Sequence, residues 1–432
     1  MDLALVAFAA SGGAGLMAGM AADRLAQAHR RLLVLLRDMG VERDPPPDEL
    51  ERAARRAVLD TLGGRTEEAP QLVALLLAEV RGLGPLEVLM EDPAVTEIMV
   101  NGPHAVWTER GGRMERTSLR FHDEMHLRRV IDRVVQRVGR RVDEATPMAD
   151  ARLPDGSRVH VILPPLALDG PVLTIRRFRA VPPGPEELTA QGSWTPEVES
   201  FLAAAVRARC NILVSGGTGS GKTTLLNVLS RYIPERERLI TIEDAAELRL
   251  QQPHVVRLET RPGTPTGIAK VDQAELLRNS LRMRPDRILL GEVRGGEALT
   301  MLQAMNTGHE GSLATLHANS PRDTLARLET MVLMAGTDLP LRAIREQVAR
   351  AVDLVVQVAR GQEGRRGVSS IVEVLGMEGD TLTMQELYRR ESAGEAHGRL
   401  CSTGLRPRLA SRLAEAGWEA AAPPRSGRGR RW

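Results

Sequence analysis

The stretch Asn211-Ile212-Leu213-Val214-Ser215-Gly216-Gly217-Thr218-Gly219-Ser220-Gly221-Lys222-Thr223-Thr224 contains a phosphate-loop pattern. An apolar run predicts a buried strand, and a glycine-rich loop and a helix over residues 222–232 follow it. Backbone N–H groups can surround a phosphate closely where no Cβ intervenes, which explains the glycines. The helix directs its positive N-terminal end at the same anion. We therefore expect this loop to bind phosphate.

The side chains of the loop also suit a magnesium nucleotide. Lys222 is expected to reach the β and γ phosphates, and the Thr223 hydroxyl to hold Mg²⁺. ATP and Mg²⁺ are thus the predicted cofactors. The predicted nucleotide-binding residues are consecutive: Gly216, Gly217, Thr218, Gly219, Ser220, Gly221, Lys222, Thr223 and Thr224.

Composition narrows the functional class of the chain. Its 432 residues suffice for two or three domains. The 58 Lys and Arg nearly balance the 56 Asp and Glu, which argues against a dedicated nucleic-acid coat. An aromatic content of 2% leaves few side chains on which bases could stack. Cys210 and Cys401 lie far apart, so we expect neither a disulfide framework nor a zinc site, and a reducing cytoplasm fits.

The N-terminal leader, residues 1–22, allows two interpretations. Residues 3–22 carry no charge, are long enough to span a bilayer, and include the Gly15-x-x-x-Gly19 spacing of packed membrane helices. Against an anchor, Ala and Gly dominate the segment, and Asp2 replaces the positive start of a signal peptide. The alternatives to an anchor are a buried or disordered leader and an over-long start of the chain.

Changes in periodicity divide the rest of the chain. Helical patterns over residues 23–40, 48–62 and 71–80 predict a helical module at 23–80. Alternating strand patterns around one amphipathic helix predict an α+β domain at 81–181. A proline-rich segment predicts a linker at 182–192. An α/β domain is expected at 193–390, followed by a C-terminal extension at 391–432 with a basic tail.

The α/β domain is expected to place chemical groups at one edge of its sheet. Strands and helices alternate from Asn211 onward, which predicts a mostly parallel sheet with helices on both faces. Ligands bind at the carboxyl ends of such strands. Glu243 follows one apolar run, Glu292 follows a second and His317 a third. Gly291 stands where a metal-holding Asp commonly precedes such a glutamate.

At these motifs the chain resembles the type II/type IV secretion ATPases, most closely the Tad/Flp pilus assembly ATPases of the CpaF/TadA type. The resemblance covers about residues 80–390, and residues 403–407 match more loosely. Four stretches carry it in order: the phosphate loop at 216–224, the acidic box at 241–248, an atypical second Walker motif at 282–294 and a histidine box at 307–318. Glycine in place of Asp at position 291 is normal in this family.

The resemblance implies a fold and roles for individual residues. It implies a RecA-like P-loop domain preceded by a smaller, PAS-like α+β domain and a helical leader. Glu292 would orient or deprotonate the attacking water, and Glu243 would act beside it on water or Mg²⁺; which is the base stays open. His317 would contact the γ phosphate, and His309 would support the same box.

The resemblance also implies that arginines of the N-terminal domain reach the nucleotide. By position these are Arg158 and Arg176, with Arg152 and Arg177 as weaker candidates. The alternative for each is an ordinary surface arginine. A positive charge beside the γ phosphate would lower the barrier to phosphoryl transfer.

The resemblance further implies a homohexamer at the inner face of the cytoplasmic membrane. Such a ring would push on inner-membrane platform proteins and act on pilin indirectly, with no nucleic acid expected. Two other functions compete with this interpretation. One is a nucleic-acid-translocating ATPase, such as a conjugative pump or a helicase, although no basic track with aromatics is present. The other is a switch that binds ATP without turnover.

Overall fold

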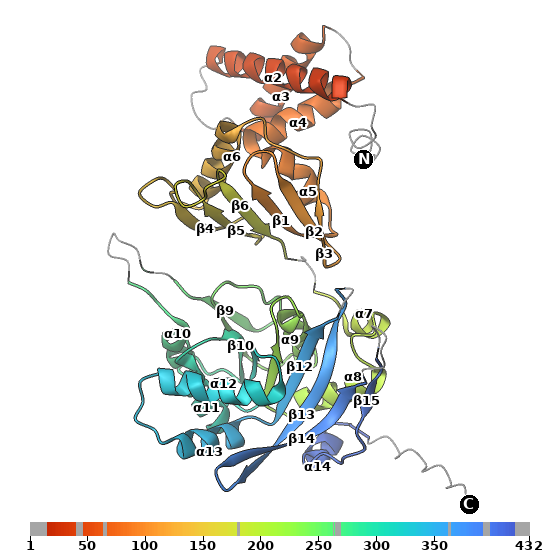
Figure 1. Ribbon diagram of the computed structural model, residues 1–432, viewed down its shortest axis with the longest axis vertical. Helices are drawn as coiled ribbons and strands as arrows, with labels where there is room; N and C mark the ends of the chain where they lie inside the picture. Colours follow the sequence, from red (N-terminus) through yellow and green to blue (C-terminus); the bar gives the residue numbers. More distant parts are fainter. Residues whose placement is uncertain are drawn as a thin grey trace, which may run out of the picture. The chain divides into compact units, whose positions relative to one another are not determined.

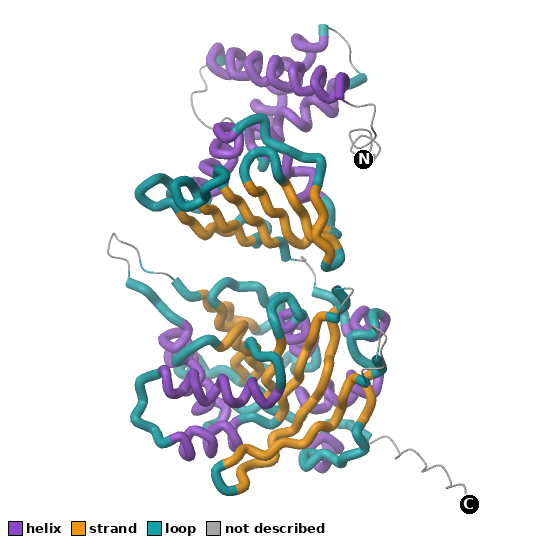
Figure 2. Tube along the Cα trace, in the orientation of Figure 1, coloured by secondary structure: helices purple, strands orange, loops and turns teal. Residues whose placement is uncertain are grey.

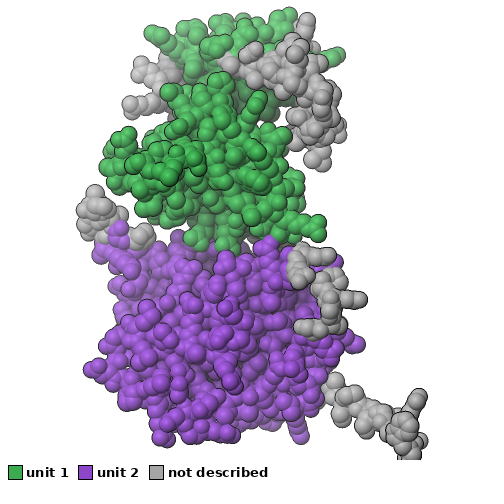
Figure 3. Space-filling model, in the orientation of Figure 1, with its two compact units in different colours: residues 1–179 green, residues 180–432 purple. Residues whose placement is uncertain are grey.

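The computed structural model describes residues 15–39, 46–63, 67–178, 182–261, 263, 269–361, 364–391 and 398–419. Residues 1–14 of the leader and the basic segment at 425–431 lie outside the described residues. The chain divides into two compact units, residues 1–179 and residues 180–432 (Figure 3). We describe each unit by itself.

Three helices form the first part of unit 1 (Figure 2): α2 (Gly15–Asp38), α3 (Pro47–Leu62) and α4 (Ala69–Arg81). Their apolar faces share a core that includes Leu32, Leu50 and Leu76. Helix α2 runs through the predicted leader boundary at 22/23, so the last residues of the apolar segment belong to the same helix as the arginines that follow. Within the described residues, we find no helix that combines the length and the apolarity needed to cross a membrane.

The second part of unit 1 is an antiparallel sheet, in the order β3-β2-β1-β6-β5-β4 within the described residues. Its core holds the predicted apolar stripe of α6, including Leu127, Ile131 and Val134. The elements are η1 (Gly84–Leu86), α5 (Glu87–Glu91), β1 (Val95–Asn101), β2 (Val106–Arg110), β3 (Arg113–Arg116), α6 (Glu124–Arg137), β4 (Met148–Arg152), β5 (Arg158–Ile162) and β6 (Val172–Arg176).

Side-chain contacts join these two parts across the predicted domain boundary at 80/81. Arg133 of α6 donates hydrogen bonds to the carbonyl oxygens of Glu79 (2.7 Å) and Gly82 (2.8 Å). These carbonyls belong to the last turn of α4, where helical partners are lacking. The helical module and the α+β domain, predicted as separate domains, therefore form one compact unit.

Unit 2 is built on a mixed sheet of nine strands among the described residues, in the order β15-β14-β13-β12-β7-β11-β10-β8-β9 (Figure 1). The strands from β12 to β9 in this order pair in parallel, and β13, β14 and β15 add antiparallel pairs. The strands are β7 (Ile212–Gly216), β8 (Leu239–Glu243), β9 (Val255–Glu259), β10 (Arg287–Val293), β11 (Leu313–Leu316), β12 (Leu354–Arg360), β13 (Arg366–Glu378), β14 (Thr381–Arg390) and β15 (Leu400–Ser402).

Helices pack against both faces of this sheet, as predicted. One core includes Leu202 of α8 and Leu226 of α9, and the other includes Leu302 of α11 and Leu328 of α12. The helices are α7 (Pro185–Ala190), α8 (Pro196–Arg207), α9 (Lys222–Ser230), α10 (Gln273–Ser280), α11 (Glu297–Asn306), α12 (Pro321–Met334), α13 (Leu341–Ala351) and α14 (Ala410–Glu415). Thr195, Asp272 and Ser320 cap α8, α10 and α12, and the side chain of each accepts a hydrogen bond from a backbone N–H.

Unit 2 of the structure includes elements beyond both predicted boundaries of the α/β domain. The segment 182–192, predicted as a linker, contains α7, whose Leu188 is buried in the core of unit 2. At the other end, β15 pairs with β14, and Leu413 and Trp418 join the same core. The unit therefore extends beyond residue 390. Proline-rich composition hid the short helix, and the partner of β15 lies in a separate part of the sequence.

A buried arginine anchors the strand that carries Glu292. Arg287, the first residue of β10, is fully buried. Its guanidinium donates to both carboxylate oxygens of Glu237 (2.6 and 3.1 Å) and to the carbonyl oxygen of Val206 (2.6 Å). A buried charge needs such a complete set of partners. This network fixes the start of β10, and the candidate site lies at the other end of the strand.

Candidate nucleotide-binding site

The loop between β7 and α9 has a backbone that needs its glycines. Gly219 and Gly221 have φ of 67° and 99°, in the left-handed region that favours glycine. A Cβ on Gly216 would overlap the carbonyl oxygen of Val358 and lie 2.5 Å from Ser220 Oγ. Strand β12 therefore packs directly on the start of the loop. Helix α9 begins at Lys222 as predicted and ends at Ser230, two residues before the predicted end.

The side chains of the loop fold back onto its own carbonyl groups. Lys222 Nζ donates to the carbonyl oxygens of Gly216 (3.1 Å) and Gly217 (3.0 Å). The Ser220 hydroxyl donates to the carbonyl oxygen of Gly217 (2.8 Å). The ammonium group thus lies over the loop, at the positive N-terminal end of α9. This arrangement is a cradle for an anionic group.

Strand register brings the predicted residues to one edge of the sheet. In β11, Leu316 pairs with Ser215 of β7, so His317 follows at the level of the loop. In β8, Ile242 pairs with Leu290 of β10, so Glu243 lies level with Gly291. Parallel strands align their carboxyl ends, and this edge therefore combines the loop, Glu243, Glu292 and His317 within unit 2.

Glu243 is held as a buried carboxylate with one oxygen left over. Its side chain is 2% exposed, and Oε2 accepts hydrogen bonds from the backbone N–H groups of Glu247 (2.7 Å) and Leu248 (3.0 Å). Oε1 is buried and has no hydrogen-bond partner among the described residues. Burial raises the pKa of the carboxyl to about 7, although the two N–H donors oppose this effect. An orphaned buried oxygen of this kind suits a cation or a water molecule.

The same carboxylate explains glycine at position 291. A Cβ on Gly291 would lie 2.7 Å from Cγ of Glu243. Any larger residue there would displace the Glu243 side chain. The carboxylate of β8 thus occupies the space beside β10 that an Asp at position 291 would need.

Glu292 lies in an irregularity of β10. Leu290 pairs with Ala314 and Val293 with Leu316, so β10 has one residue more than β11 between these pairs. Such bulges redirect side chains and occur beside active sites. Arg294 donates to Glu292 Oε2 (2.7 Å) and to Asp244 Oδ2 (3.4 Å).

Arg294 therefore links the ends of β8 and β10. Its hydrogen bond to the Glu292 carboxylate raises the pKa of the Arg294 guanidinium. The backbone N–H of Arg294 donates to Glu297 Oε1 (2.5 Å) at the start of α11. The position of Glu292 thus depends on an arginine whose own backbone is fixed.

The two histidines of the histidine box lie at opposite ends of β11. His317 follows the carboxyl end of the strand and is partly exposed. His309 precedes the strand, where its carbonyl oxygen accepts a hydrogen bond from the Ser312 hydroxyl (2.8 Å). The structure places His309 away from the carboxyl edge of the sheet, and its support of the histidine box stays a prediction.

The arginines expected from the N-terminal domain form a row across the sheet of unit 1. Arg152 pairs with Arg158, and Arg158 pairs with Arg176, on β4, β5 and β6. Arg176 pairs in turn with Glu97, with Nε 3.9 Å from Oε1. Like charges directly opposite each other destabilise a sheet. We call Arg152, Arg158 and Arg176 the arginine row; its concentrated positive charge suits an anion.

Arg177 does not belong to the arginine row. Its guanidinium donates to the carbonyl oxygens of Leu89 (3.1 Å), Met90 (2.6 Å) and Val95 (3.1 Å). These bonds satisfy the C-terminal end of α5 and the start of β1. Arg177 therefore has a structural role here, and its contact with the nucleotide stays a prediction.

The residues present fit Mg²⁺ bound together with a nucleotide. No group of three or more His, Cys, Asp or Glu suited to a metal occurs in the part of the chain that the structure describes. Magnesium does not need such a cage, because it is bound by one or two protein oxygens, phosphate oxygens and water. Thr223 in the first turn of α9 and the orphaned Oε1 of Glu243 offer such oxygens.

The Type II/IV secretion system protein family model matches residues 79–401. The chain belongs to this family. It is 39% identical over 322 residues to a conjugal transfer protein of Mycobacterium tuberculosis, covering 73% of this chain and 91% of the relative. It is also 39% identical over 311 residues to the type IV secretion system protein PtlH of Bordetella pertussis, covering 64% and 89%.

A solved structure has a fold similar to that of this chain. The pilus retraction motor PilT with bound ADP has a TM-score of 0.50 at 22% identity, covering 66% of this chain and 81% of that one. At this level of identity the likeness concerns the fold. It supports an α/β architecture with mixed sheets for this member of the secretion family.

Sequence reasoning missed the arginines that surround the site within unit 2. Arg294 lies two residues after Glu292 in the motif at 282–294, and the motif alone does not predict a role for it. Arg360 and Arg366 come close to the loop because β12 pairs with β7 and with β13. The sequence signal for Arg360 and Arg366 was an arginine on each side of a short segment between two strands.

Proposed function

We propose that this protein is an ATP-hydrolysing motor of a secretion or pilus-assembly machine. The observation that carries the proposal is the shared edge of unit 2. There the glycine loop, a buried carboxylate with an unpartnered oxygen and a second carboxylate on a bulge follow neighbouring strands. This is the set of groups that phosphoryl transfer to water uses: a phosphate cradle, a magnesium ligand and a group that activates water.

Each residue of the edge has a proposed task. Backbone N–H groups of residues 216–224 and Lys222 hold the phosphates. Thr223 and Glu243 would hold Mg²⁺, which neutralises phosphate charge when bound. Glu292 orients the attacking water and accepts its proton, or shares this task with Glu243. His317 contacts the γ phosphate. From unit 1, Arg158 and Arg176 supply positive charge to the nucleotide, with Arg152 as a weaker contributor.

The proposal also covers the superfamily of each unit, the subtype of the secretion machine and its partners. We place the ATPase unit among RecA-like P-loop motors and the sheet of unit 1 among PAS-like domains. The four motifs at 216–224, 241–248, 282–294 and 307–318 support the Tad/Flp pilus assembly subtype. In this proposal a homohexamer works peripherally at the cytoplasmic membrane, contacts inner-membrane platform proteins and acts on pilin indirectly.

The test is the release of phosphate from ATP by the purified full-length chain with Mg²⁺. We expect turnover that vanishes in Lys222→Ala and persists in Lys270→Ala, which removes the exposed lysine of the 269–271 segment. Absence of turnover together with tight ATP binding would instead indicate a nucleotide-gated switch.

A second candidate function follows from the names of the similar proteins. The relative from M. tuberculosis is named for conjugal transfer. This favours the alternative of a pump for nucleic acid. Adding single-stranded and double-stranded DNA to the turnover assay separates the two functions. An unchanged rate supports the protein-secretion motor, and strong stimulation supports the nucleic-acid pump.

A further inference from the structure

The turn that connects β12 and β13 carries arginines on both sides, at residues 360 and 366. Strand β12 is fixed against the phosphate loop, because Val358 pairs with Gly216 and its side chain fills the space where a Gly216 Cβ would be. Side chains two residues apart on a strand share a face. Arg360 therefore extends from β12 on the same face as Val358, over the loop.

Distances confirm this placement for both arginines. A guanidinium nitrogen of Arg360 lies 3.7 Å from the position of a Cβ on Gly219. The Cδ of Arg366 lies 3.7 Å from the position of a Cβ on Gly221. These glycines have positive φ and flank Ser220 in the middle of the loop. The two arginines thus border the phosphate loop on the side of β12. Strand β11 lies on the other side of β7.

Three cationic side chains meet at this loop. Arg360 pairs directly with Arg366 across the antiparallel ladder. The ammonium of Lys222 and the positive end of α9 lie at the same loop. An anion in the cradle would attract all of these positive groups.

From this geometry we infer that Arg360 and Arg366 bind the phosphate chain of the nucleotide held by the loop of the same chain. The inference rests on the proposed function, and it adds binding residues from unit 2 itself to the arginines expected from unit 1. Guanidinium groups suit this task because their planar set of donors matches phosphate oxygens. Figure 1 shows the C-terminal end of β12 and the start of α9 at the same edge of the sheet.

The experiment measures binding of ATP, ADP and inorganic pyrophosphate to the full-length chain by isothermal titration calorimetry. The variants are Arg360→Ala, Arg366→Ala and the double variant, with Arg365→Ala as the matched control. Arg365 is exposed and directly precedes β13.

We expect the double variant to weaken all three ligands at least about tenfold, since charge-assisted hydrogen bonds to phosphate are lost. The salt dependence of binding should fall in parallel, and Arg365→Ala should bind like the wild type. Arg360→Lys with Arg366→Lys should recover part of the loss. The melting temperature without nucleotide should change little, because both arginines are exposed.

Unchanged affinity of the double variant for ATP and pyrophosphate would overturn the inference. A lowered melting temperature with unchanged relative affinities for the three ligands and unchanged salt dependence would also overturn it. Failure of the proposed function itself has a different signature. In that case wild-type protein and Lys222→Ala would bind ATP equally.

Discussion

The phosphate loop of unit 2 and the arginine row of unit 1 present positive charge in different ways. The loop uses main chain, and its neighbours Ser215 and Gly216 are buried between strands. The arginine row uses side chains, and Arg158 and Arg176 are exposed at the end of their strands. A main-chain site is fixed by the fold of one segment. The arginine row instead depends on the pairing of three strands.

In the proposed function, the loop binds the nucleotide and the groups around the loop accelerate hydrolysis. The predictions below test that division. They run from the largest expected effect to the smallest.

Lys222→Ala should abolish both ATP binding and hydrolysis, because the ammonium group lies over the loop that holds the phosphates. Equilibrium binding of ATP and phosphate release measure the two effects. Lys270→Ala is the control and should leave both at the wild-type level. Wild-type binding by Lys222→Ala would contradict the assignment of the loop.

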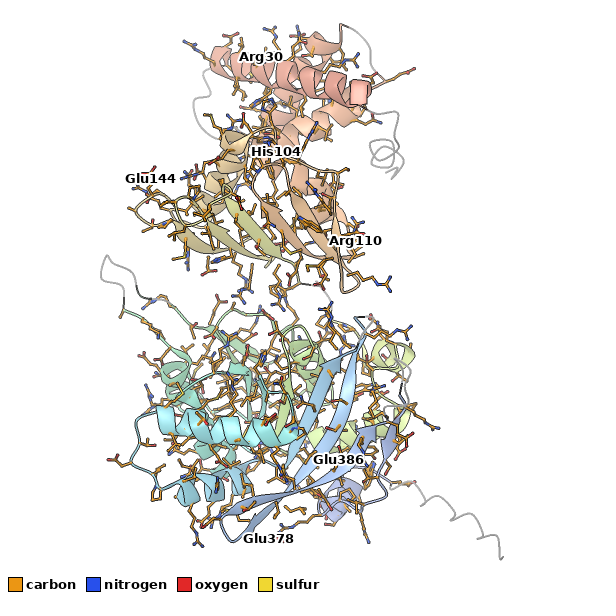
Figure 4. The ribbon with its side chains drawn as sticks, viewed as in Figure 1. Arg30, His104, Arg110, Glu144, Glu378 and Glu386 are labelled. Atoms are coloured by element: carbon orange, nitrogen blue, oxygen red, sulfur yellow. The ribbon has the colours of Figure 1, made fainter. Side chains whose placement is uncertain are left out.

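Glu292→Gln should retain ATP binding and reduce kcat on the order of 10³-fold, because an amide cannot accept the proton of the attacking water. Steady-state phosphate release and calorimetric binding separate the two quantities. Glu378→Gln is the matched control. Glu378 is exposed and is the last residue of β13 (Figure 4). A wild-type kcat in Glu292→Gln would remove this residue from the chemical step.

Arg158→Ala should reduce kcat on the order of 10²-fold while Kd for ATP changes little, because its charge is expected to act on the transition state. Arg110→Ala is the control. Arg110, labelled in Figure 4, belongs to the same sheet and is paired with Asp92 (3.2 Å) and Glu115 (3.1 Å). Equal effects of the two variants on kcat would show that the arginine row has no special role.

Glu243→Gln should stabilise the nucleotide-free protein relative to the wild type, and this gain should grow as pH rises. Burial raises the pKa of this carboxyl from 4.5 to about 7. The folded state therefore favours the protonated form, and its contribution to stability is present below pH 4.5 and lost as pH rises through 7. Urea unfolding at pH 5 and pH 8 should show a gain that grows to at most about 3 kcal/mol. A gain independent of pH would contradict the burial argument.

The sequence predicted the parts of the site that are local in the chain. The loop at 216–224 is one continuous segment, and its glycines follow from backbone geometry alone. Glu243 and His317 were placed correctly because parallel strands align their carboxyl ends. An apolar run separates His309 from His317, and only His317 follows this run, at the carboxyl edge of the sheet.

Features that depend on pairing between distant segments could not be predicted. Glycine at position 291 is explained by the Glu243 side chain on a neighbouring strand. The arginine row needs the pairing of three strands, and the arginines at 360 and 366 approach the loop through β12. The ends of unit 2 likewise depend on distant segments, since α7 and β15 are stabilised by contacts with distant residues.

The most direct test of the account is calorimetric titration of the purified full-length chain with ATP in the presence of Mg²⁺. The account predicts saturable binding that inorganic pyrophosphate competes away, since the main chain of the loop holds phosphate groups. No heat of binding from a folded, soluble sample at millimolar ATP would contradict it.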